Sequence, residues 1–254
     1  MKNQQSKFTA STAYPSTGSQ ILARQSMAWA CVSKTILPLI LAFTGFLGYQ
    51  HQVTAQACNQ VEDFTSAITI GLSQAPSVWY VDRYAPNGFF SPSGDLGGAT
   101  LKHSINVADG AVNRAPAFQG AFYNTQGRKY DLPAMTRTMQ IDLYVPTAWG
   151  TSNKREAGLW GTAIDIANAV SGYPILEFTS DGGIPRFRCY ETGTGLWVDL
   201  GLPTGFVYNA WYTLEIELLN NSEFLYTVGN LQFTTTSGSG DASVAISNVI
   251  LQGY

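Results

Sequence analysis

Apolar and polar positions alternate in short runs along the chain, and this alternation predicts β-strands. In residues 135–145, Met139, Ile141, Leu143 and Val145 share one face, while polar and aromatic side chains fill the other. A period of two with one polar face is typical of a half-buried antiparallel strand. The sequence has no long apolar stretch of helical period, so helices are not expected to form the core.

Glycine, proline, asparagine, aspartate and serine separate these runs at short intervals. This pattern predicts an all-β domain, an antiparallel two-sheet β-sandwich or jelly roll. The expected strands are residues 64–70, 77–84, 99–107, 117–124, 135–145, 158–166, 174–180, 184–191, 195–200, 211–219, 222–228, 231–236 and 243–252.

The segment PILEFTSDGGIPRFRCYE, residues 174–191, predicts a β-hairpin. Either Asp-Gly or Gly-Gly within residues 181–183 can form a two-residue turn. The first turn places Glu177 opposite Arg186, and the second places it opposite Arg188. Both registers give a cross-strand ion pair on the polar face. Both also send the same side chains into the core, namely Leu176, Phe178, Phe187 and Cys189.

The N-terminal region has the order of a secretory signal peptide. An apolar run at residues 35–49 follows Lys34, and a polar stretch then ends in Ala-Gln-Ala at residues 55–57. The sequence therefore predicts a signal peptide over residues 1–57, with Met27 as an alternative start, and a single domain over residues 58–254. The run is shorter than the roughly 20 residues of a membrane helix. An uncut N-terminal anchor is the alternative to a secreted, extracellular or periplasmic protein.

Cleavage after Ala57 would change the charge of the protein. It would remove four of the 14 Lys and Arg residues and no Asp or Glu, leaving 10 against 17 and a formal charge of −7. Nucleic acid and anionic membrane need a basic surface and are therefore not expected as partners. A neutral or cationic ligand fits this charge better.

Two cysteines, Cys58 and Cys189, remain after the predicted cleavage. In an oxidising compartment they are expected to form a disulfide that ties the N-terminus to a mid-chain strand. Free thiols are one alternative. A lipid anchor on Cys58 is another, although Ala55 stands where a lipobox prefers leucine.

Few residues of the expected domain suit catalysis or metal binding. His103 is the only histidine in residues 58–254, which argues against nucleophilic triads and histidine-based metal sites. A bound Ca²⁺ ion is the alternative that the sequence leaves open, because hard cations prefer oxygen ligands from loops. No other cofactor is indicated. The aspartates in or near expected loops are Asp95, Asp109, Asp131 and Asp181.

Tryptophans are the stronger indication of function. Their rings stack on the C–H faces of sugars while neighbouring polar groups bind hydroxyls. Trp79 and Trp211 are expected in the core. Trp149 and Trp160 are the candidates for the edge of a binding groove, since Trp149 lies in a long loop-like segment.

The segments YNAWYTLEIELLNN (208–221) and ASVAISNVILQGY (242–254) resemble the concanavalin A-like lectin/glucanase superfamily, which includes laminin-G-like modules. The resemblance covers most of residues 60–254. It implies two curved antiparallel sheets with a glycan on the concave face or its rim loops. The Glu-x-Asp-x-x-Glu motif of glucanase members and the Gln-x-His motif of alginate-lyase members do not occur in residues 58–254, which lowers the expectation of an enzyme.

We therefore expect a secreted, lectin-like carbohydrate-recognition module. The expected ligand-binding residues are Gln140, Trp149, Trp160, Glu177, Arg186, Arg188 and Tyr190. A polysaccharide-cleaving hydrolase or lyase on the same fold is the first alternative, with Glu177, Glu215 or Asp142 as its carboxylates. A structural or adhesive exported protein without a small ligand is the second alternative.

Overall fold

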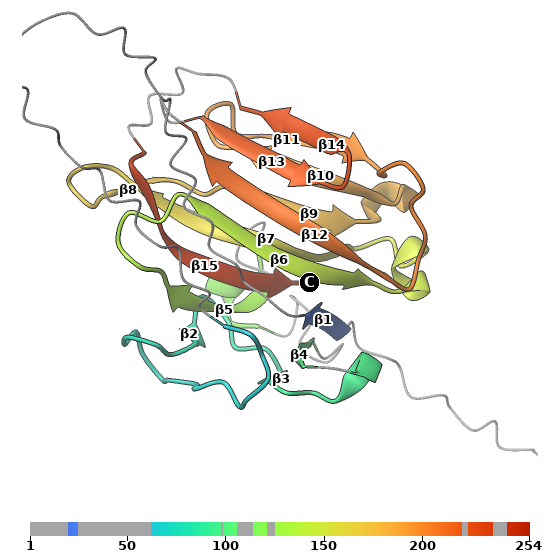
Figure 1. Ribbon diagram of the computed structural model, residues 1–254, viewed down its shortest axis with the longest axis horizontal. Helices are drawn as coiled ribbons and strands as arrows, with labels where there is room; N and C mark the ends of the chain where they lie inside the picture. Colours follow the sequence, from blue (N-terminus) through green and yellow to red (C-terminus); the bar gives the residue numbers. More distant parts are fainter. Residues whose placement is uncertain are drawn as a thin grey trace, which may run out of the picture.

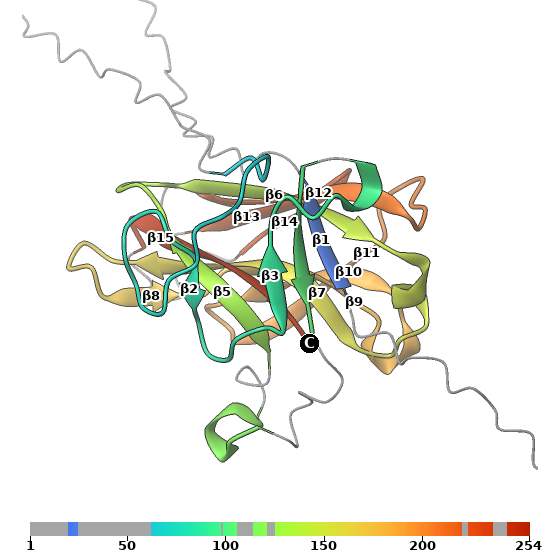
Figure 2. The same cartoon turned by 90° about the horizontal axis from the view of Figure 1, so that it is seen from below.

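The computed structural model describes residues 62–97, 99–105, 114–120, 125–219, 223–235 and 243–254, together with the backbone of residues 20–24. These residues form two stacked antiparallel sheets (Figures 1 and 2), as the alternation predicts. The fold is an all-β sandwich of the jelly-roll class, and its described helical segments are short 3₁₀ turns. The described residues include no helix with the length and apolar character needed to cross a membrane.

The seven-stranded sheet places β1 between two groups of strands that come later in the chain. Its order is β14 (Leu231–Thr234), β13 (Phe224–Val228), β12 (Ala210–Leu218), β6 (Thr138–Val145), β1 (Gln20–Arg24), β4 (Thr100–Ser104) and β3 (Gly88–Phe90).

The eight-stranded sheet contains the hairpin of residues 174–191. Its order is β11 (Leu196–Gly201), β10 (Arg186–Glu191), β9 (Ile175–Thr179), β7 (Arg155–Ile164), β15 (Ala245–Gly253), β5 (Gln126–Asp131) and β2 (Tyr80–Val81). The short strand β8 (Val170–Gly172) pairs with β7 beside this path.

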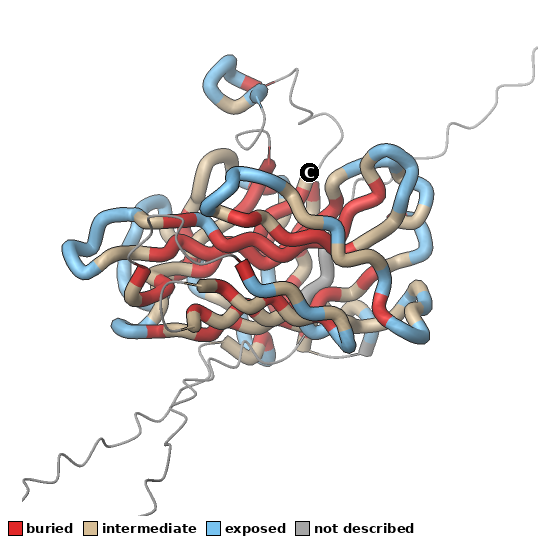
Figure 3. Tube along the Cα trace, turned by 90° about the horizontal axis from the view of Figure 1, so that it is seen from above, coloured by how far each residue is buried: buried red, intermediate tan, exposed pale blue. Residues whose placement is uncertain are grey.

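The core lies between the two sheets, along the central strands that Figure 3 shows as buried. Alternation places one apolar face of β6 inward, as predicted, with Met139 fully buried, and one apolar face of β12 likewise, with Ile216 fully buried. Trp79 is also fully buried and contacts the rings of Phe89 and Tyr130, both at 5.2 Å between centroids. Burial of large rings supplies much of the hydrophobic stabilisation of such a sandwich.

Several expectations differ from the structure. Residues 116–118 of the expected strand 117–124 form a 3₁₀ turn, and residues 121–124 are outside the described range. Residues 64–70 form no extended strand; they contribute a bridge from Ile70 to Trp79 and bury Phe64 in the core. Trp211 is not in the core, because it lies on the outer face of β12 with its ring 5.3 Å from that of Tyr144.

The predicted signal segment is described in only one place. Residues 20–24 form β1 inside the seven-stranded sheet. The remainder of residues 1–57, including Met27 and the predicted cleavage position, lies outside the described residues. The signal peptide and the domain boundary at residue 58 therefore stay predictions.

Candidate functional site

The hairpin β9–β10 builds the floor of the candidate site. Leu176, Phe178, Phe187 and Cys189 are fully buried in the core between the sheets, as predicted. Alternation sends the intervening side chains to the outer face of the eight-stranded sheet. Glu177 lies opposite Arg188 there, which confirms the second of the two predicted registers.

The connection between the two strands is longer than a two-residue turn. β9 ends at Thr179 and β10 begins at Arg186, with a 3₁₀ turn at Asp181–Gly183 between them. The Gly183 N–H donates to the Ser180 carbonyl at 2.9 Å. Gly182 and Gly183 have φ values of 69° and 76°, a left-handed conformation that favours glycine. This wider loop carries the Asp181 carboxylate back toward the arginines.

A buried ion pair holds the centre of this face. The Arg188 guanidinium donates to Glu177 Oε1 at 2.9 Å through Nε and at 2.7 Å through Nη2. Arg155, on the neighbouring strand β7, contacts the same carboxylate with both nitrogen–oxygen distances at 3.4 Å. The side chains of Glu177 and Arg188 are only 4% and 7% exposed. A buried charge pair of this kind needs such hydrogen bonds to offset the loss of solvation.

The pair extends outward into a chain of ion pairs across β10. Arg188 and Arg186 each donate to Asp181 at 2.8 Å, and Arg186 also donates to Asp199 on β11 at 2.7 Å. Burial raises the pKa of Asp181, but the charges of Arg188 and Arg186 and a hydrogen bond from Thr179 outweigh it, so that this pKa lies below its usual value. The carboxylate therefore stays ionised and fixes both arginines.

Aromatic rings cover the arginines. Arg188 lies 4.1 Å from the centroid of the Trp197 ring, and Arg155 lies 5.5 Å from Trp197 and 5.6 Å from Trp160. Arg83 contacts the Trp160 ring at 5.3 Å. Tyr190, paired with Trp197 across β10 and β11, has its ring centroid 5.3 Å from that of Trp197. Cation–π contacts of this geometry hold guanidinium groups in place.

A small cleft opens beside this cluster, at the junction of β7, β9 and β15. Its lining residues are Thr125, Arg155, Glu156, Ala157, Trp160, Glu177, Gln252, Gly253 and Tyr254. Gln252 donates to Asp82 at 2.7 Å, and Asp82 also pairs with Arg83 and Lys129 at 2.9 and 3.0 Å. Polar groups on both sides of the cleft are therefore held in fixed positions.

The structure brings most of the predicted ligand residues together. Trp160, Glu177, Arg186, Arg188 and Tyr190 all belong to the outer face of the eight-stranded sheet. We call this surface the tryptophan–arginine face and add Arg83, Arg155 and Trp197 to it.

Two predicted residues are placed elsewhere. Gln140 lies on β6, opposite Glu215 on β12, and therefore on the outer face of the other sheet. Trp149 is 3% exposed in the core, where its ring stacks on Phe178 at 6.0 Å. The expectation that Gln140 shares one face with Glu177 is therefore wrong, and so is the expectation that Trp149 lies at the edge of a binding groove.

Trp197 and Arg155 are functional candidates that were not expected from the sequence. Trp197 lies in the predicted strand 195–200, and residues 192–195 connect this strand to the hairpin. Extending the hairpin by one strand places Trp197 opposite Tyr190, so alternation alone could have found it. Arg155 had no such signal, because a register shift separates it from Ala157 in β7.

The cysteines and the loop aspartates form no second candidate site within the described residues. Cys189 is a buried free thiol, and Cys58 lies outside the described residues, so the disulfide stays a prediction that the structure does not support. Among the described residues, no three His, Cys, Asp or Glu side chains form a group that could hold a metal ion. Asp109, one of the predicted calcium ligands, lies outside the described residues.

Comparisons with known proteins do not assign the chain to a family. No protein-family model matches the chain, and no curated protein matches it. Among solved structures, the chain is similar to the crystal structure of LamAcat from Zobellia galactanivorans, with 11% sequence identity and a TM-score of 0.39. That match covers 75% of this chain and 84% of the other. The strand pairing itself identifies the chain as an antiparallel β-sandwich.

Proposed function

We propose that the protein is an exported carbohydrate-recognition module that binds a glycan on the tryptophan–arginine face. The observation that carries this proposal is the combination of Tyr190 and Trp197, both partly exposed, with arginines locked beside them. Aromatic rings provide stacking surface for sugar C–H groups. Charged and amide groups around them hydrogen-bond hydroxyls and fix the orientation of the ligand.

The fixed geometry of the face supports binding. Arg188 has a carboxylate partner in Glu177 and another in Asp181, and it stacks on Trp197. Groups that are already immobile lose little conformational entropy when a ligand binds. The face is therefore preorganised for a ligand, whereas long side chains in solvent would have to be ordered.

The charge balance of the face favours a neutral glycan. Arg155 and Arg188 pair with Glu177, and Arg186 pairs with Asp181 and Asp199. Arg83 and Lys129 likewise share Asp82. A polyanionic ligand would have to compete with these carboxylates. A neutral polysaccharide would use the same groups as hydrogen-bond partners without displacing them.

Recognition fits the carboxylates of the cleft better than cleavage does. Glu156 and Glu177 both line the cleft. Glu177 accepts hydrogen bonds from two arginines, and Glu156 accepts one from Ser152. A glycosidase needs one carboxyl group that is protonated and able to give its proton to the leaving group. The hydrogen bonds from the arginines and Ser152 hold both carboxylates in fixed positions, which suits the orientation of a bound ligand. The resemblance of residues 208–221 to concanavalin A-like domains is compatible with a binding module on this sandwich.

A glycan array followed by titration calorimetry tests the proposal. Trp197→Ala should weaken binding at least about tenfold, which corresponds to about 1.4 kcal/mol. Trp211→Ala is the matched control, because Trp211 also contacts a tyrosine but lies on the outer face of the other sheet. Thermal unfolding of both variants controls for folding. Absence of binding to every glycan, or equal losses in the two variants, would contradict the proposal.

The enzymatic alternative has its own test. Purified protein is incubated with a panel of polysaccharides, and reducing ends or unsaturated uronides are measured. We expect no release above that of heat-denatured protein. Release that Glu177→Gln abolishes, while Glu215→Gln retains it, would establish cleavage in the cleft instead.

A further inference from the structure

β1 occupies an unusual place in the seven-stranded sheet. It lies between β4 and β6 (Figure 1) and pairs antiparallel with both, although residues 25–61 separate it in sequence from the rest of the described domain. All five of its residues pair with β4, from Gln20 opposite Ser104 to Arg24 opposite Thr100. Only Ala23 and Arg24 pair with β6. The strand is therefore held along one side and only partly along the other.

Without β1 the sheet would fall into two parts. β6 pairs on its other side with β12, and β4 pairs on its other side with β3. The facing edges of β4 and β6 would then present unpaired backbone N–H and C=O groups. Such edges bind an added strand through main-chain hydrogen bonds. The gap between β4 and β6 is thus shaped for one antiparallel strand.

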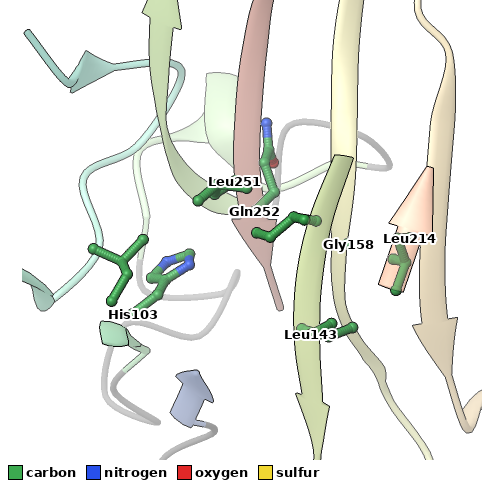
Figure 4. A pocket seen from close by; sticks show the side chains of 8 residues that line it. His103, Leu143, Gly158, Leu214, Leu251 and Gln252 are labelled. Atoms are coloured by element: carbon green, nitrogen blue, oxygen red, sulfur yellow. The ribbon is translucent and has the colours of Figure 1, made fainter. Parts of the chain in front are cut away.

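The floor of this gap is a cavity between the two sheets (Figure 4). Its apolar lining residues are Leu101 from β4, Ile141 and Leu143 from β6, Leu214 from β12 and Leu251 from β15. The backbone positions opposite Leu101 and His103 belong to Ala23 and Ile21 of β1. The cavity therefore lies beneath the strand that fills the gap.

His103 marks the polar end of this floor. It is 1% exposed, and Figure 4 shows its ring directed toward the cavity, with Leu251 and Gln252 across from it. Neither of its ring nitrogens has a hydrogen-bond partner within the part of the chain that the structure describes. Burying such a group without a partner costs free energy. The buried His103 ring, without hydrogen bonds among the described residues, and the cavity beside it are both unfavourable in a closed core. This part of the core is therefore not optimised for stability.

We propose that the gap between β4 and β6 is a strand-acceptor site whose occupant is the segment Gln20–Arg24, and that this strand can be exchanged for a separate copy of the same segment. Backbone pairing with β4 along all five residues supplies the affinity for an added strand. Cleavage after Ala57, as the sequence predicts, would separate the strand from the domain and open the site. This site lies on the opposite sheet from the tryptophan–arginine face.

The experiment uses the full-length chain and a fluorescein-labelled peptide of residues 17–27. In the variant Leu22→Pro, the proline removes a backbone donor from the middle of β1 and vacates the site. Amides of β4 and β6 should exchange hydrogen at least about tenfold faster than in the unaltered protein. The peptide should bind this variant and restore their protection, while a peptide carrying the same proline should not. Amides of β9 and β10 serve as the internal reference.

A second measurement covers the case in which Leu22→Pro does not fold. The unaltered chain is refolded with the labelled peptide in molar excess and passed over a size-exclusion column. Co-elution of the label with folded protein is expected for the unaltered peptide and not for the proline peptide. Failure of the label to co-elute, or exchange at β4 and β6 that does not respond to Leu22→Pro, would overturn the proposal.

Discussion

His103 stays neutral in the folded protein over most of the pH range. Burial lowers its pKa to about 3, and the charge of Arg128 adds to the effect. The pKa in the unfolded chain is close to 6.5, so between these two values the unfolded state binds a proton that the folded state does not. The free energy of unfolding contributed by this residue is therefore full above pH 6.5 and falls as the pH decreases toward 3.

Replacing His103 should remove this pH dependence. His103→Leu keeps the volume of the side chain and has no group to protonate. Between pH 6.5 and 4.5, the unaltered protein should lose about 2 kcal/mol more stability than the variant, because the slope approaches about 1.4 kcal/mol per pH unit only below pH 6.5. Urea unfolding at several pH values measures the difference. Parallel curves for the two proteins would mean that His103 is hydrated or hydrogen-bonded in solution.

Cys189 should be unreactive in the folded protein. Burial, followed by the charge of Glu191, raises the pKa of its thiol to about 12, and the thiolate is the reactive form. In the variant Cys31→Ser, Cys58→Ser, a thiol reagent at pH 8 should modify Cys189 only after denaturant is added. Rapid modification of the native variant would show that Cys189 is accessible and would leave the predicted disulfide with Cys58 as the better account.

At the scale of the element, strands β7 and β9 approach each other closely at Gly158. A Cβ atom added there would lie 2.4 Å from Glu177 Cβ and 2.5 Å from the Leu176 carbonyl oxygen. Gly158→Ala should therefore destabilise the protein by about 1–3 kcal/mol, because backbone atoms must move. Gly120→Ala is the control, since an added Cβ there meets no heavy atom within 4 Å. Similar unfolding midpoints for both variants would contradict this packing.

The hairpin β9–β10 depends on the buried pair of Glu177 and Arg188. Arg188→Met should cost about 3–5 kcal/mol, because it leaves the Glu177 carboxylate buried with only the longer contact to Arg155. Adding Glu177→Gln to this variant should recover a large part of the loss, since the unpaired charge is then removed. Additive losses in the two single variants and the double variant, measured by denaturant unfolding, would show that the two side chains do not interact.

Alternation in the sequence predicted which face of each strand is buried. It predicted less well which strands lie next to each other. The inward residues of β6 and the hairpin were all identified, because a period of two separates a buried from an exposed side. The same period does not reveal which sheet a strand joins, and for this reason Gln140 was placed with Glu177. β5 (Gln126–Asp131) was missed because its sequence QGRKYD has no apolar alternation. The Lys129 side chain of β5 forms an ion pair with Asp82, which directly follows β2.

At the scale of the whole molecule, the sandwich presents two outer faces of different chemistry. One carries the arginines, Trp160 and Trp197, whereas the other carries Asp142, Glu215 and Glu217 in addition to Trp211. Burial and the nearby Glu217 charge raise the pKa of Glu215. A ligand that recognises paired arginines and aromatic rings should therefore distinguish the two faces. The sequence could indicate the chemistry of a single hairpin, but only the pairing of β7, β9, β10 and β11 assembled the site.

Hydrogen exchange in the presence of the bound glycan tests the location of the binding site most directly. We predict slower exchange for amides of β10 and β11, at residues 186–201, with no change in β6 and β12. Protection confined to β6 and β12, at residues 138–145 and 210–218, would place the ligand on the opposite face and contradict binding at the tryptophan–arginine face.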